Sequence, residues 1–147
     1  MVYQGTTPLW HSNTFQAAAP GIVSDTGYTV SAWVKLNGST GTDQSVICQQ
    51  GDNVPSVNLF YREASRSWDV MTTSQDSSAA HWISVGASGG SAYPGAWTHI
   101  AATYSADTEV LAFYVNGGQV GSARMPSPWV AATAPERRGS PPAPAAP

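Results

Sequence analysis

The chain has 147 residues, enough for one domain, and its hydrophobic fraction of 41% is sufficient for a packed core. Charged residues make up only 10% of the sequence, against roughly 25% in an ordinary soluble domain, and the net charge is −3. Because Lys35 is the single lysine, the chain lacks both the basic patch of a nucleic-acid binder and the polybasic segment of a membrane-surface binder. This composition excludes both classes of partner.

Membrane insertion and cysteine chemistry are not expected either. No apolar run approaches the roughly 18 residues of a membrane span, and residues 1–15 show no signal-peptide pattern. Cys48, the one cysteine, excludes an intrachain disulfide and a cysteine-based zinc site, and is expected to be a small buried hydrophobic residue.

Residues 1–21 form a lead-in of weak pattern that supplies one edge strand at most. From Tyr28 onward apolar residues recur with period two, as in half-buried strands. In the first run Val30, Ala32 and Val34 share one face, while Trp33 lies on the other face with polar residues. The predicted strands are Tyr28–Leu36, Gln44–Gln50, Ser56–Glu63, Arg66–Thr73, Ala80–Val85, Trp97–Tyr104, Glu109–Val115 and Val120–Arg124.

Turn residues separate these runs, which begin about 10–17 residues apart, and Asn116-Gly117 is a strong signal for a type I′ hairpin turn. A parallel sheet would need crossover helices, and no helical period occurs between the runs. The sequence therefore predicts an all-β fold, an antiparallel two-sheet sandwich or jelly roll over residues 22–124. Residues 125–147 are rich in Pro and Ala, without periodicity, and are predicted to be a disordered tail.

Three segments carry a family signature. They are YTVSAWVKL at Tyr28–Leu36, and W-T-H-I-A-A-T-Y at Trp97–Tyr104 followed by F-Y-V-N-G at Phe113–Gly117. In this order and spacing the chain resembles, over about residues 22–124, the bacterial laminin G-like (LamG) jelly-roll domain of the concanavalin A-like lectin/glucanase superfamily. The resemblance implies a two-sheet sandwich of the concanavalin A-like type. It also implies a module of a larger secreted or cell-surface protein that binds carbohydrate or an extracellular protein without catalysis.

Both ends depart from the pattern of that family. Family domains carry further strands before the YTVSAWVKL strand, whereas here Val2–Phe15 is the one stretch that could supply a strand. After Ser127-Pro128-Trp129 the pattern dissolves where family domains have a closing strand. Two interpretations stay open: an incomplete domain, through truncation or a shifted reading frame, and a natural short variant with a linker.

The sequence predicts neither a metal site nor a cofactor. Some relatives hold calcium at one edge of the sandwich, but here the carboxylates are scattered, and the closest pair, Asp107 and Glu109, lies in a predicted hairpin turn. The nearby His99 is expected to be a structural, hydrogen-bonded histidine.

No catalytic residues are predicted. The glucanase branch of the superfamily uses an E-x-D-x-E triplet, which is absent. Glu63 and Asp69 lie on neighbouring runs and could face each other, but a solvated surface pair is the favoured interpretation. The G-x-S-x-G pattern at Gly86–Gly90 lacks the strand-to-helix turn that exposes a nucleophilic serine. The chain is therefore predicted not to be an enzyme.

Aromatic side chains are the candidates for ligand contact, because an aromatic ring can stack on the apolar face of a sugar while its polar edge stays in water. Trp68, Trp82 and Tyr93 lie near loops or strand ends and are the predicted ligand-binding residues, with core packing as the alternative for each. Trp33 and Trp97 are assigned to the core. The functional prediction is a non-catalytic binding module. The alternatives are an accessory or remnant domain of a glycoside hydrolase, and a structural spacer without a ligand.

Overall fold

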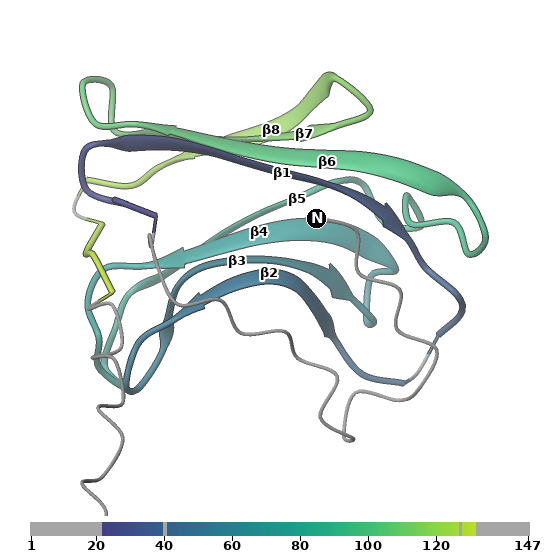
Figure 1. Ribbon diagram of the computed structural model, residues 1–147, viewed down its shortest axis with the longest axis horizontal. Helices are drawn as coiled ribbons and strands as arrows, with labels where there is room; N and C mark the ends of the chain where they lie inside the picture. Colours follow the sequence, from purple (N-terminus) through teal and green to yellow (C-terminus); the bar gives the residue numbers. More distant parts are fainter. Residues whose placement is uncertain (1–21, 40, 127, 132–147) are drawn as a thin grey trace, which may run out of the picture.

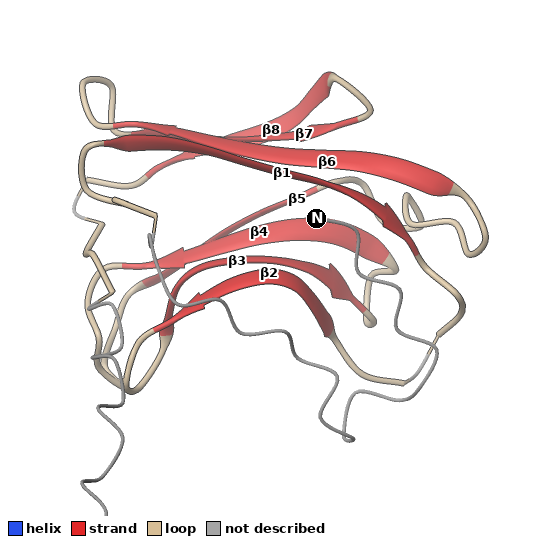
Figure 2. Ribbon diagram, viewed as in Figure 1, coloured by secondary structure: helices blue, strands red, loops and turns tan. Residues whose placement is uncertain are grey.

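A computed structural model of the chain describes residues 22–39, 41–126 and 128–131. All regular structure in these residues is β-strand (Figure 2), and they contain no helix long and apolar enough to cross a membrane. The strands are β1 (Gly27–Lys35), β2 (Gln44–Gln50), β3 (Pro55–Arg62), β4 (Ser67–Thr73), β5 (Trp82–Gly86), β6 (Trp97–Ser105), β7 (Val110–Val115) and β8 (Gly118–Arg124).

The strands form two antiparallel sheets of four, in the orders β1-β6-β7-β8 and β2-β3-β4-β5. The sheets are stacked face to face, and the strands β2–β4 are bent into an arch whose hollow side faces away from the other sheet (Figure 1). The predicted all-β, two-sheet sandwich is confirmed, and every predicted strand end lies within two residues of that in the structure.

Period-two alternation explains why these segments pair as strands. In β6 every second residue is buried, from Thr98 to Tyr104, and the residues between them face outward. The core between the sheets consists of the inward-facing apolar residues, chiefly Val57, Leu59, Tyr61, Trp68, Val70, Val85, Ile100, Ala102, Tyr104, Leu111, Phe113 and Met125.

Tight turns connect β6 to β7 and β7 to β8. Asn116 and Gly117 have φ values of 50° and 82°, which confirms the predicted type I′ turn between β7 and β8. Glu109 has a φ of 55° and precedes β7, so the acidic pair with Asp107 lies in the β6–β7 turn, as the sequence predicts.

The packed domain extends beyond Arg124, where the sequence placed its end. Met125 is 1% exposed and its carbonyl accepts a hydrogen bond from the Tyr104 hydroxyl at 3.0 Å. Trp129 donates its indole N–H to Thr73 Oγ1 at 2.9 Å, and its carbonyl accepts a hydrogen bond from the Ser24 hydroxyl. The expectation of a tail from residue 125 is therefore corrected for residues 125, 126 and 128–131. The lead-in at 1–21 and the segment 132–147 lie outside the described residues.

Candidate functional site

The hollow face of the β2–β5 sheet carries a connected group of polar side chains. The register pairs Asp69 with Gly86, Met71 with Ser84 and Thr73 with Trp82, so alternate residues of β4 and β5 point to this outer side. Residues between them, such as Val70 and Val85, face the core. We call this outer side of β2–β5 the concave face.

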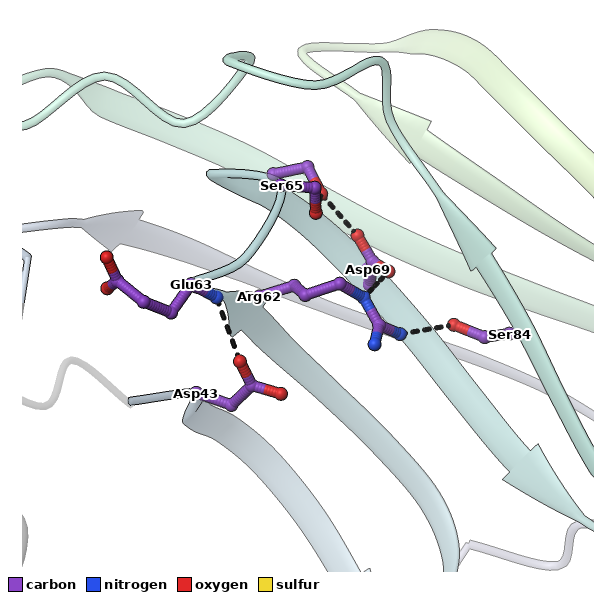
Figure 3. Close-up of polar contacts among 7 residues, drawn as sticks. Asp43, Arg62, Glu63, Ser65, Asp69 and Ser84 are labelled. Carbon is purple, nitrogen blue, oxygen red and sulfur yellow. Dashed lines mark hydrogen bonds and ion pairs between the residues drawn. The ribbon is translucent and has the colours of Figure 1, made fainter. Parts of the chain in front are cut away.

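An ion pair lies at the centre of the polar group (Figure 3). Arg62 Nε lies 2.6 Å from Asp69 Oδ2, and Arg62 Nη2 donates to Ser84 Oγ at 3.0 Å. Ser67 Oγ donates to Asp69 Oδ1 at 2.7 Å and is itself 2.7 Å from Ser65 Oγ. Strands β3, β4 and β5 thus each contribute to one connected network.

The network is partly shielded from water. The side chain of Asp69 is 7% exposed and that of Arg62 is 35% exposed. The Arg62 guanidinium also lies over the Phe60 ring, 4.9 Å from its centroid, in a cation–π contact. Gly86 leaves room for the carboxylate, since a Cβ at that position would lie 2.6 Å from Asp69 Oδ1. The arrangement holds the guanidinium and the carboxylate in a fixed geometry.

Trp82 stands at the other end of the same face. It is 45% exposed and lies four residues before Gly86 along β5, a separation of about 13 Å at the usual rise of a strand. Ser84 and Met71 lie between Trp82 and the ion pair. The concave face therefore has a polar end and an aromatic end.

Asn58 occupies the middle of this face, opposite Met71 on β4 and Cys48 on β2. Asn58 is 9% exposed, and its Oδ1 atom has no hydrogen-bond partner in the structure. Cys48 is exposed, which corrects the expectation of a buried residue: its register partner Asn58 faces outward, and so does Cys48.

The two carboxylates that could have formed a catalytic pair have separate partners. Asp69 is paired with Arg62, whereas Glu63 Oε1 accepts a hydrogen bond from Ser39 Oγ at 2.6 Å. Asp43, at the same rim (Figure 3), accepts a hydrogen bond from the Glu63 backbone N–H at 2.8 Å. Within the described part of the chain, no three His, Cys, Asp or Glu residues come together as a metal-binding group.

A family model described as the concanavalin A-like lectin/glucanases superfamily matches residues 11–144. The chain belongs to this superfamily. A solved structure, the native heptameric SAP-like pentraxin from Limulus polyphemus, is similar with a TM-score of 0.49 and 14% sequence identity. The match covers 74% of this chain and 49% of the pentraxin chain, so the chain spans about half the length of that protein. No curated protein matches the chain.

The lectin-fold sandwich separates the three predicted ligand-binding residues. Trp82 is on the concave face, as described above. Tyr93 is 68% exposed in the β5–β6 loop, and the neighbouring Ala92 N–H donates to the Arg66 carbonyl, which ties this loop to the β3–β4 turn beside the ion pair. Trp68 is 3% exposed and packs edge-on against Tyr61 in the core, so the prediction of a ligand contact is wrong for this residue.

The assignment of Trp33 and Trp97 to the core is also corrected. They are 62% and 49% exposed on the outer side of the β1–β6 pair. His99, which was expected to be a structural histidine, lies with its ring centroid 5.2 Å from that of Trp33.

Sequence reasoning missed Arg62 and Ser84 altogether and considered Glu63, not Arg62, as the residue facing Asp69. The signal was present in the alternation, because Arg62, Asp69 and Ser84 occupy the outward positions of three consecutive strands. The contact itself depends on the hairpin registers, which the alternation does not specify.

Proposed function

We propose that the chain is a non-catalytic module that binds carbohydrate on its concave face. The observation that carries the proposal is the combination on this face of a fixed Arg62–Asp69–Ser84 network at one end and the exposed Trp82 at the other. Sugars match such a surface, since vicinal hydroxyls exchange hydrogen bonds with guanidinium and carboxylate groups, and their C–H faces stack on indole. Membership of a lectin and glucanase superfamily supports this reading.

Binding without hydrolysis is favoured by the state of the carboxylates. Glycoside hydrolysis needs two carboxyl groups about 5–9.5 Å apart, one of them free to give or take a proton. On the concave face Asp69 is held in an ion pair and accepts a further hydrogen bond from Ser67, so it is committed as a hydrogen-bond acceptor. This supports recognition rather than acid–base chemistry.

The family resemblance supports a proposal for the wider setting of the module. We propose that it acts outside the cell, as one module of a larger secreted or surface protein. Tyr93 is included in the proposed site because its loop borders the polar end of the concave face. A ligand of two or three sugar units would reach from there toward Trp82.

The experiment is a glycan array with the purified full chain, followed by calorimetry on the sugars retained. W82A should weaken binding about fivefold, since the loss of one stacked ring removes on the order of 1 kcal/mol. S84A should weaken it less, because it removes a partner of Arg62 and leaves the ion pair. Val120 is an exposed apolar residue on β8 of the other sheet, so V120A is the matched control and should bind normally.

Unchanged affinity in W82A would overturn the assignment of the site. If no glycan is retained at millimolar concentration, the carbohydrate proposal fails, and a protein partner or a spacer role takes its place.

A further inference from the structure

A second group of outward-facing side chains lies on the opposite side of the sandwich. On β1 and β6 the register pairs Trp33 with His99 and Lys35 with Trp97. Directly opposite residues of an antiparallel pair project from the same face, so these four side chains form a compact patch. We call it the β1–β6 patch.

The patch exposes much more aromatic surface than a structural role requires. Trp33 and Trp97 are 62% and 49% exposed, although neither contributes to the core. The two indoles occupy diagonal positions, with their Cα atoms about 7–8 Å apart. Scattered exposed apolar residues need no explanation, but a contiguous aromatic group bordered by polar residues marks an interaction site.

The backbone beneath the patch is fixed by contacts on both sides. The His99 N–H donates to Asn116 Oδ1 at 2.9 Å, and the His99 carbonyl accepts from the Asn116 N–H at 2.7 Å. At the other end the Gly95 N–H donates to the Leu36 carbonyl at 2.7 Å, next to Lys35 and Trp97. The rings are therefore presented by backbone that is already in place before a ligand arrives.

Charge selects the kind of ligand. The protein is acidic overall, with a net charge of −3, yet its single lysine lies within this patch. The outward-facing residues of β1 and β6, namely Thr29, Ser31, Trp33, Lys35, Trp97, His99, Ala101 and Thr103, include no carboxylate. The imidazole of His99 adds an N–H donor in either protonation state.

We propose that the β1–β6 patch is a second binding site, independent of the concave face, that takes a sugar acid such as a uronate unit. The pyranose ring stacks on Trp33 or Trp97, and the carboxylate is bound by the Lys35 ammonium and the His99 N–H. A neutral sugar would use only the rings, whereas an acidic peptide would lack the flat C–H face that stacks on them. A carboxylated pyranose can both stack on the tryptophans and bind to Lys35 and His99.

The test uses the full chain with three probes: an oligogalacturonide, a neutral galactose oligomer of equal length, and a polyglutamate peptide. Calorimetry should show tighter binding of the oligogalacturonide than of the other two, and this preference should decrease as salt is raised. W33A/W97A should abolish binding of the oligogalacturonide. K35Q should weaken it about fivefold and remove the preference over the neutral oligomer.

W82A is the control that separates the two sites. It changes the concave face alone, so binding of the oligogalacturonide at the β1–β6 patch should be unaffected. The single variant W33Q serves as a second test of the patch if W33A/W97A lowers the melting temperature. The proposal would be overturned if the polyglutamate peptide bound as tightly as the oligogalacturonide, or if W33A/W97A bound the oligogalacturonide fully. It would also be overturned if the native chain were a dimer that dissociates in W33Q.

Discussion

Replacement of Arg62 by methionine tests whether the concave-face network stabilises the folded domain in addition to its proposed role in ligand binding. Arg62 lies 2.6 Å from Asp69 and 3.0 Å from the Ser84 hydroxyl. Methionine keeps an apolar stem near Phe60 but removes the guanidinium. Asp69, with a side chain only 7% exposed, would then lose its counter-charge and keep only the hydrogen bond from Ser67.

The expected loss lies between two limits. Removing one partner of a fully buried ion pair costs about 3–5 kcal/mol, and exposed pairs contribute about 1 kcal/mol or less. Because Asp69 is nearly buried while Arg62 is 35% exposed, we expect R62M to lower the free energy of unfolding by about 2 kcal/mol. For a domain of this size that corresponds to a fall of about 8 °C in melting temperature.

Urea denaturation followed by tryptophan fluorescence measures this loss, because the buried Trp68 reports on the core beside Asp69. The double variant R62M/D69N should recover about half of the stability, since the neutral amide still accepts from Ser67 and leaves no unpaired charge. A loss below about 0.5 kcal/mol in R62M would falsify the reasoning, because it would show that Asp69 is solvated and that the network does not hold it.

Three further predictions concern the rest of the domain. G51A should lower the melting temperature and shift the fluorescence spectrum, because a Cβ at Gly51 would lie 2.3 Å from the ring of Trp129; an unchanged spectrum would contradict the docking of Trp129. Desolvation raises the pKa of Asp76, but hydrogen bonds from the β2–β3 turn together hold this pKa below its ordinary 3.8. D76N should therefore be less stable than the native chain at neutral pH, and the difference should disappear as pH falls through that lowered pKa; a constant difference would refute it. Burial, and then the charge interaction with Tyr104, raise the pKa of Tyr28 above 10.0. The free energy of unfolding, measured by urea denaturation, should therefore decrease as pH rises above 10, and Y28F should reduce this decrease.

The fold was predictable because the signal for a half-buried strand is local. Alternation along β1 and β6 identifies both the strand and its buried face, without knowledge of the partner strand. The end of the domain was not predictable from composition. Met125 and Trp129 lie among prolines and alanines, but each packs against strands that are distant in the sequence.

The tryptophans show which sequence rule deserves priority. Trp33 shares its face with Thr29, Ser31 and Lys35, whereas Trp68 is in phase with Val70 and Thr72. Face membership therefore places Trp33 outside and Trp68 inside, as the structure has them. The opposite prediction followed from the closeness of Trp68 to a strand end and from the place of Trp33 in a strand that resembles the family's. On a strand, the face to which a side chain points is decided by its place in the period-two alternation. The size of an aromatic ring changes only the free energy gained when that ring is buried.

The ion pair that stabilises the concave face also limits how tightly this face can bind. Asp69 and Ser84 already accept hydrogen bonds from Arg62, so a sugar hydroxyl must compete with them for this guanidinium. Each hydrogen bond to the sugar therefore replaces an existing one and adds little net free energy. Because the network is preorganised, little entropy is lost in ordering its side chains when a ligand binds. The net free energy of binding is nevertheless small. We therefore expect a single concave face to bind with a dissociation constant nearer to 1 mM than to 1 nM. Strong attachment to a polysaccharide would then depend on several linked sites, and the two binding faces proposed for this sandwich would together provide that valency.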